Sequence, residues 1–180
     1  MNRAMTSTLH HYIGGRKVPG DSGRSGDIYN PATGQVTKQV PLASKSEVES
    51  AIAAAQAAFP GWSAVPAGRR AQIMFNFRDL IRANMDRLAE AVSSEHGKTL
   101  EDAKGSITRG LEVVEFACGI SQVLKGEYSE SVAGGVDSWS MRQPLGVCAG
   151  LTPINFHAMV PMWMFPMAIA CANTFVLKPS

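Results

Sequence analysis

The segment from Leu145 to Leu177 contains no aspartate, glutamate, lysine or arginine. On length alone it could cross a membrane, because about 20 consecutive apolar residues span a bilayer as a helix. Prolines and polar side chains interrupt it, however, at Pro153, Asn155, His157, Pro161, Pro166 and Asn173. A helix in contact with lipid would have to satisfy all of these polar groups internally. We therefore interpret the segment as the buried centre of an α/β domain and expect no membrane partner.

The pattern within this uncharged segment predicts a strand, a helix and a second strand. Residues 145–151 and 174–177 are predicted to be buried strands, and residues 156–172 a helix that its prolines kink or shorten. A strand–helix–strand unit of this length places its two strands parallel in one sheet. One such unit leaves a sheet edge unpaired and a face uncovered, so we expect more of the fold to follow Ser180 in a longer protein.

The residues before this unit are predicted to form hairpins and helices. Apolar segments separated by Gly or Pro turns predict hairpins at residues 12–18 and 28–40. Helices are predicted over residues 44–59, 67–94 and 99–125. The fold class is therefore α/β, with N-terminal hairpins and helices that lead into the βαβ unit.

Local signals refine these limits. A Ser-x-x-Glu capping box opens the first helix at Ser44, and Pro60 is expected to stop it. The second helix has an apolar stripe formed by Ile73, Phe77, Leu80, Ile81, Leu88 and Val92. The third has one formed by Ile107, Leu111, Val114 and Ile120. Residues 138–142 alternate like a further strand, and residues 1–10 are expected to be a flexible N-terminus.

The composition argues against several classes of protein. The net charge is +2 and the 17 basic residues are scattered, so we expect no nucleic acid as a partner. The three cysteines, Cys118, Cys148 and Cys171, have neither the spacing of a disulfide framework nor that of a zinc site. The first ten residues carry one arginine and no apolar run, unlike a signal peptide. A cytoplasmic protein without a bound metal is expected.

Several motifs together resemble those of one enzyme family. Residues 152–157 (Thr-Pro-Ile-Asn-Phe-His), 162–166 (Met-Trp-Met-Phe-Pro) and 172–180 (Ala-Asn-Thr-Phe-Val-Leu-Lys-Pro-Ser) resemble the first strand and helix of the NAD domain in aldehyde dehydrogenases. Residues 29–34 (Tyr-Asn-Pro-Ala-Thr-Gly) and 95–99 (Glu-His-Gly-Lys-Thr) resemble landmarks of that family's N-terminal hairpin and helices. Within the superfamily, the sequence is most similar to the CoA-acylating methylmalonate-semialdehyde dehydrogenases.

The resemblance implies that residues 11–180 are the N-terminal part of a Rossmann-like NAD-binding domain, incomplete relative to the family fold. It also implies NAD-dependent oxidation of malonate or methylmalonate semialdehyde, with transfer of the acyl group to coenzyme A and loss of carbon dioxide. The products would be acetyl-CoA or propionyl-CoA, and the full-length protein would be a homodimer or homotetramer. The alternatives are another aldehyde dehydrogenase, such as a succinate-semialdehyde type, and a fragment without catalytic activity.

Asn155 is the candidate catalytic residue. A side-chain amide can stabilise the oxyanion that develops when a thiol adds to an aldehyde, and the resemblance implies this role for Asn155. The alternative is that Asn155 only caps the following helix. None of the cysteines lies in a context like that of the family's nucleophile, and the general-base glutamate is expected beyond Ser180. The 180-residue chain alone is therefore expected to be inactive.

Lys178 follows a predicted parallel strand, at the edge where such sheets bind ligands. The resemblance implies that its ammonium binds the adenine-ribose hydroxyls of NAD, while Thr152 and Ile154 contact the cofactor mainly through their backbones. The alternative for Lys178 is a solvated surface lysine. A Gly-x-Gly-x-x-Gly fingerprint is absent, but the cofactor site of this family does not depend on it.

Arg109 is the candidate for substrate specificity. The semialdehyde carries a carboxylate, which a planar guanidinium can bind through two hydrogen bonds, and the resemblance implies this role for Arg109. The alternative is a surface arginine paired with Glu112 or Glu101. The sequence departs from the family pattern at His157, where proline is usual, and at Ala172, where glycine is usual. Ala172 matters if the backbone there needs a positive φ, which alanine resists.

Overall fold

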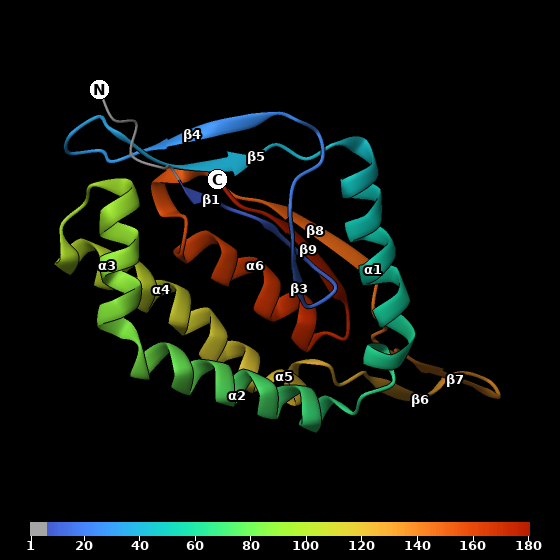
Figure 1. Ribbon diagram of the computed structural model, residues 1–180. Helices are drawn as coiled ribbons and strands as arrows, with labels where there is room; N and C mark the ends of the chain where they lie inside the picture. The colour runs from blue at the N-terminus through green and yellow to red at the C-terminus, as the bar shows by residue number, and fades with distance from the viewer. Residues whose placement is uncertain (1–6) are drawn as a thin grey trace.

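In the computed structural model, which describes residues 7–180, a pair of parallel strands lies between two helices (Figure 1). The strands are β8 (Val147–Leu151) and β9 (Thr174–Lys178), and helix α6 (Met159–Ala170) connects them. Their register runs from Val147 opposite Thr174 to Leu151 opposite Lys178. Helix α1 (Lys45–Ser63) contacts both strands from the other side. The predicted βαβ unit is therefore confirmed.

The other elements surround this unit. The remaining helices are α2 (Ala67–Ala83), α3 (Met85–His96), α4 (Leu100–Cys118) and α5 (Ile120–Val123). The remaining strands are β1 (Ser7–Thr8), β2 (His11–Ile13), β3 (Arg16–Val18), β4 (Ser25–Tyr29), β5 (Val36–Pro41), β6 (Tyr128–Ala133) and β7 (Val136–Trp139). A short 3-10 turn, η1 (Ile154–Phe156), precedes α6.

The two predicted N-terminal hairpins are confirmed, since β2 pairs antiparallel with β3 and β4 pairs antiparallel with β5. Within the expected flexible N-terminus, Ser7 and Thr8 pair with β5, and residues 1–6 lie outside the described residues. A third hairpin, β6–β7, replaces the strand predicted at residues 138–142, and β6 was not predicted. Every residue of this hairpin is exposed, so burial on one face cannot impose a strong alternation.

Helix α1 was predicted to stop at Pro60, but it continues to Ser63. A proline removes its own N–H from the helical ladder and crowds the carbonyl four residues earlier, which kinks a helix without always ending it. The last turn is also held from outside, because the indole N–H of Trp62 donates to the carbonyl oxygen of Ile169 at 3.0 Å.

The single helix predicted over residues 67–94 is two helices, α2 and α3, separated at Asn84. The Asn84 side chain donates to the carbonyl oxygen of Leu80 at 2.8 Å, and such bonds compete with the helical backbone. Gly119 similarly separates α4 from α5. The helix predicted over residues 156–172 is shorter, because η1 occupies its beginning.

The main core lies between α4, α6 and the two helices α2 and α3. Its buried residues are Ile81, Ala89, Val92, Ala103, Ile107, Leu111, Val114 and Met162. Gly110 permits the close approach of α4 and α6, since a Cβ atom there would lie 2.5 Å from Cε of Met162. The apolar stripe predicted for residues 99–125 is thus confirmed, with Ile120 buried in a second cluster.

At two places the exposed surface differs from what the apolar pattern suggests. Ile73 and Leu80 were assigned to the apolar stripe of their helix, yet their side chains are 44% and 62% exposed. Residues 145–151 were predicted to be buried, but Leu145 is 92% and Leu151 73% exposed. Periodicity identifies an apolar face, whereas burial needs another element against it, and β8 pairs only with β9 among the described residues.

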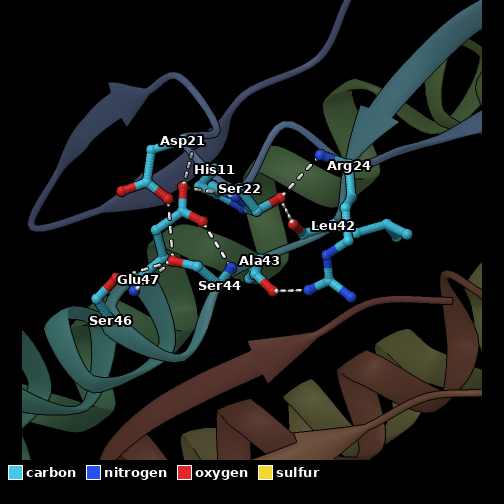
Figure 2. A network of polar contacts seen from close by, with 9 residues as sticks. All are labelled: His11, Asp21, Ser22, Arg24, Leu42, Ala43, Ser44, Ser46 and Glu47. Carbon is cyan, nitrogen blue, oxygen red and sulfur yellow. Dashed lines mark hydrogen bonds and ion pairs between the residues drawn. The ribbon is translucent and has the colours of Figure 1, made fainter.

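Glu47 ties the start of α1 to the loop before it (Figure 2). The predicted capping box is present, because the backbone N–H of Ser44 donates to one carboxylate oxygen at 2.7 Å and that of Glu47 donates to the Ser44 hydroxyl. The other carboxylate oxygen accepts the backbone N–H of Asp21 at 2.9 Å and lies 3.4 Å from Nε2 of His11. The pKa of Glu47 is lowered to about 2, chiefly by the hydrogen bond from the Ser44 backbone N–H, whereas burial acts in the opposite direction.

Candidate active site

The carboxyl ends of β8 and β9 meet at one edge of the parallel pair. Thr152 follows β8 directly and is buried, and its backbone N–H donates to the carbonyl oxygen of Lys178 at 3.2 Å. The Lys178 side chain is exposed and forms no ion pair within residues 7–180. The structure therefore brings two of the predicted cofactor residues together and leaves the ammonium free at the ligand-binding edge of such sheets.

The next residues form what we call the Asn155 turn, Ile154–His157. Asn155 is exposed, and its amide forms no hydrogen bond with any of residues 7–180. It does not cap α6, whose N-cap residue is Ala158, so the capping alternative is not supported. Nδ1 of His157 lies 2.5 Å from the carbonyl oxygen of Ile154 and closes the turn. The Asn155 amide is thus available to a ligand.

Arg109 lies on α4 with an exposed side chain. In the part of the chain that the structure describes, it pairs with neither Glu101 nor Glu112, so neither ion pair of the alternative interpretation forms. Its carbonyl oxygen accepts the indole N–H of Trp163 at 3.2 Å, which connects α4 to the N-terminal half of α6. Trp163 was not singled out from the sequence, although a lone indole N–H in an apolar helix signals a specific partner.

The 95–99 segment, which comprises the end of α3 and the turn into α4, packs against the Asn155 turn. The rings of His96 and His157 lie 5.6 Å apart between centroids, and Nζ of Lys98 lies 5.0 Å from the ring centroid of Phe156. The motif was noticed in the sequence, but its contact with this turn was not predicted. No local signal in either segment indicates the other.

The opposite end of α6 is held by side chains from two other helices. Trp62 bonds to Ile169, as described above, and Nε of Arg70 donates to the carbonyl oxygen of Ala170 at 2.9 Å. Arg70 also bonds to the carbonyl of Val65, and burial lowers the pKa of its guanidinium. This end of α6 is therefore fixed by groups on α1 and α2.

Asn173 completes the connection from α6 to β9. Its side-chain oxygen accepts the backbone N–H groups of Leu145 at 2.7 Å and Gly146 at 3.0 Å, and its side-chain nitrogen donates to the carbonyl of Ala168 at 3.1 Å. The residue before it, Ala172, has a φ of 69°, in the left-handed region that favours glycine. Alanine, which stands here where the family usually has glycine, therefore adopts an unfavourable backbone conformation.

The sequence profile of the aldehyde dehydrogenase family matches residues 18–180. The chain belongs to this family. It is 54% identical over 96% of its length to the malonate-semialdehyde dehydrogenase of Pseudomonas aeruginosa, and covers 35% of that protein. It is 50% identical over 98% of its length to the mitochondrial, acylating methylmalonate-semialdehyde dehydrogenase of Arabidopsis thaliana, and covers 29% of that one. The predicted resemblance is therefore confirmed.

Solved structures of aldehyde dehydrogenases have the same fold. A Sinorhizobium meliloti protein assigned as a methylmalonate-semialdehyde dehydrogenase, crystallised with NAD, superposes with a TM-score of 0.95 at 50% identity, over 99% of this chain and 36% of that one. Aldehyde dehydrogenase 21 of Physcomitrella patens, in complex with the product succinate, gives 0.88 at 26% identity, over 98% and 37%. The chain thus spans about a third of the length of the relatives it matches.

The three cysteines of this aldehyde dehydrogenase chain lie in partly or fully buried surroundings. Cys118 is buried and its thiol bonds to the carbonyl of Val114, while Cys148 and Cys171 are partly buried. Burial raises the pKa of Cys118 and of Cys171, which favours the unreactive thiol over the thiolate. None of the helices in residues 7–180 is long and apolar enough to cross a membrane.

Proposed function

We propose that this chain is part of an NAD-dependent, CoA-acylating semialdehyde dehydrogenase. The complete enzyme would convert malonate or methylmalonate semialdehyde to acetyl-CoA or propionyl-CoA with loss of carbon dioxide. The identities of 54% and 50% to enzymes named for these substrates support this choice, compared with 26% to the succinate complex. The nucleophile and the general base would be supplied by the part of the family fold that the chain does not span.

The free amide of Asn155 is the observation on which the proposed chemistry rests. When a thiolate adds to the aldehyde, the carbonyl oxygen becomes an oxyanion, and an N–H group already directed to that position stabilises it without reorganisation. Asn155 suits this role because it is exposed, lies just past the carboxyl end of β8, and forms no hydrogen bond within residues 7–180.

Lys178, Thr152 and Ile154 fit a contact with NAD at the sheet edge. NAD, when bound, accepts the hydride from the substrate carbon. The exposed ammonium of Lys178 can donate to ribose hydroxyls. The N–H of Thr152 and the carbonyl of Ile154 are engaged within the chain, so the Thr152 carbonyl and the Ile154 N–H are the backbone groups left for the cofactor. The side chains of these two residues should then tolerate conservative replacement.

Product analysis of the complete enzyme tests the proposed reaction. With malonate semialdehyde, NAD and coenzyme A, we expect acetyl-CoA and NADH in equal amounts, and much slower turnover of succinate semialdehyde. Release of free malonate at the same rate with and without coenzyme A would instead indicate the hydrolytic type of enzyme. The 180-residue chain by itself is expected to produce no NADH.

Arg109 is proposed to bind the carboxylate of the semialdehyde. In Arg109→Met, the KM for malonate semialdehyde should rise about tenfold to a hundredfold, because a charge-assisted hydrogen bond contributes about 1.5–3 kcal/mol. The KM for propanal, which lacks the carboxylate, should stay the same. Arg87→Met is the matched control, since Arg87 is also exposed and forms no ion pair within residues 7–180. Equal changes for both substrates would contradict the assignment.

We also propose a cytoplasmic homodimer or homotetramer. Light scattering of the complete enzyme measures its mass, and fractionation of cells measures its location. A monomeric mass would contradict the proposed oligomer. Recovery with an organelle, such as the mitochondrion named for the Arabidopsis relative, would contradict the proposed location.

A further inference from the structure

The 95–99 segment has no part in the proposed chemistry, yet it contacts both residues that follow Asn155. The ring of His96 packs on His157 with centroids 5.6 Å apart and planes tilted by 31°. The ammonium of Lys98 lies over the ring of Phe156, 5.0 Å from its centroid. The backbone that leaves Asn155 is therefore held at two successive side chains by one neighbouring segment.

Lys98 is itself fixed. Its side chain is only 7% exposed, and Nζ lies 3.2 Å from both the carboxylate of Asp102 and the hydroxyl of Ser106 on α4. A cation that is paired and shielded from water has little freedom to move, and its attraction to an aromatic face is strengthened by the loss of water. Lys98 therefore connects the ring of Phe156 to the rigid helix α4.

His157 closes the Asn155 turn from the other side. A carbonyl oxygen can only accept, so Nδ1 of His157 must carry the hydrogen and donate it to Ile154 across the 2.5 Å contact. This bond spans Asn155, and no other side chain in residues 7–180 forms a hydrogen bond with the turn. His157 has a φ of −70°, which is the value that a proline ring would impose.

We infer that His157, together with His96 and Lys98, holds the Asn155 turn in the conformation that presents the amide to the oxyanion. These three are positioning residues, since each acts through the turn. The inference rests on the proposed role of Asn155. Its energetic reason is that a displacement of about 1 Å in a group that contacts the reacting atoms can reduce the rate about 100-fold.

The rigidity of the turn can be measured on the complete enzyme in the absence of substrate. Backbone order parameters from ¹⁵N relaxation should be about 0.85 at Asn155 and Phe156, and should fall below about 0.6 in His157→Ala. His157→Pro should keep the turn rigid, because the observed φ suits proline. His10→Ala is the matched control, because His10 is exposed and remote in sequence. Unchanged order parameters in His157→Ala would overturn the inference whatever the enzyme does.

Kinetics of the complete enzyme separate this inference from the proposed function. His157→Ala should lower kcat about tenfold with little change in KM, and His157→Pro should restore it. Lys98→Met should act in the same direction, with Lys125→Met, an exposed lysine, as its control. In an Asn155→Ala background, His157→Ala should have no further effect. If His157→Ala lowered kcat equally in the Asn155→Ala background, or did not lower kcat in the wild-type background, the inference would be refuted. Full activity of Asn155→Ala would refute the oxyanion role instead.

Discussion

Helix α6 connects the two parallel strands, and its two ends are held in different ways. At the C-terminal end, Trp62, Arg70 and Asn173 donate to three successive backbone carbonyl groups. At the N-terminal end, the Asn155 turn is closed by one side-chain bond, and Asn155 is exposed without a partner within residues 7–180. The same helix thus has one end fixed by partly or fully buried polar side chains and one end preceded by an exposed, unpaired amide.

The C-terminal end of α6 thus contributes to stability, whereas the N-terminal end carries the residue proposed for the chemistry. A buried carbonyl without a hydrogen bond costs about 1–3 kcal/mol, so the C-terminal end gains most from Arg70, which donates to Ala170. The carbonyls of Ala168 and Ile169 also accept the backbone N–H groups of Asn173 and Ala172. A group that must bind a developing charge has to stay unpaired in the free protein, so the N-terminal end cannot be stabilised in the same way. Substitutions at the two ends should therefore affect different measurements.

The largest effect is expected at the N-terminal end. Asn155→Ala in the complete enzyme should reduce kcat about 100- to 1000-fold, because the proposed oxyanion donor is lost. Its unfolding free energy should change by less than about 0.5 kcal/mol, since the amide is exposed and bonds to nothing within residues 7–180. Steady-state kinetics and urea titration measure the two quantities. Asn76→Ala, on the exposed face of α2, controls for both, and a large loss of stability in Asn155→Ala would break the comparison.

The C-terminal end should show the reverse. Arg70→Met should lower the unfolding free energy by about 3 kcal/mol, because the carbonyl groups of Ala170 and Val65 lose a charged donor. Arg69→Met, at the exposed neighbouring position, should be nearly neutral. Urea titration followed by tryptophan fluorescence suits this test, since Trp62 lies at the same end. Equal stability of the two variants would mean that the buried guanidinium does not hold α6.

A second helix sharpens the comparison, since α1 is anchored by side chains at both ends. The pKa of Glu47 is about 2 in the folded chain and near 4.5 when unfolded, so its stabilisation is complete above pH 4.5 and is lost as the pH falls toward 2. Urea titrations across this range should show a smaller pH dependence in Glu47→Gln. Glu49→Gln, an exposed carboxylate of the same helix, should follow the wild type. Parallel curves for Glu47→Gln and the wild type would contradict a structural role for this carboxylate.

Signals that act within a few residues could be read from the sequence. The capping box at Ser44, the two N-terminal hairpins and the βαβ unit all depend on neighbouring residues, and all are confirmed. The place of Lys178 at the carboxyl edge of the parallel pair followed from the rule for such sheets.

Contacts between distant segments could not be read in this way. Nothing near Arg70 in the sequence indicates a carbonyl 100 residues away, and nothing near His96 indicates the ring of His157. The exposed faces at Ile73 and Leu80 show the same limit, because periodicity gives the direction of a side chain and not what covers it. The anchored end of α6 and the support of the Asn155 turn were therefore visible only in the structure.

The smallest effect is expected at Ala172, which follows the anchored end of α6. Its φ of 69° is costly for alanine and free for glycine, so Ala172→Gly should raise the unfolding free energy by about 0.5 kcal/mol, after the loss of a buried methyl group. The same change at Ala57, exposed within α1, should lower it by about 1 kcal/mol. Changes of opposite sign in the unfolding free energy of the two variants, measured by urea titration, would show that the strain is local to this turn. A loss of stability at both positions would mean that the buried methyl outweighs the backbone strain, and that the anchored end already fits alanine.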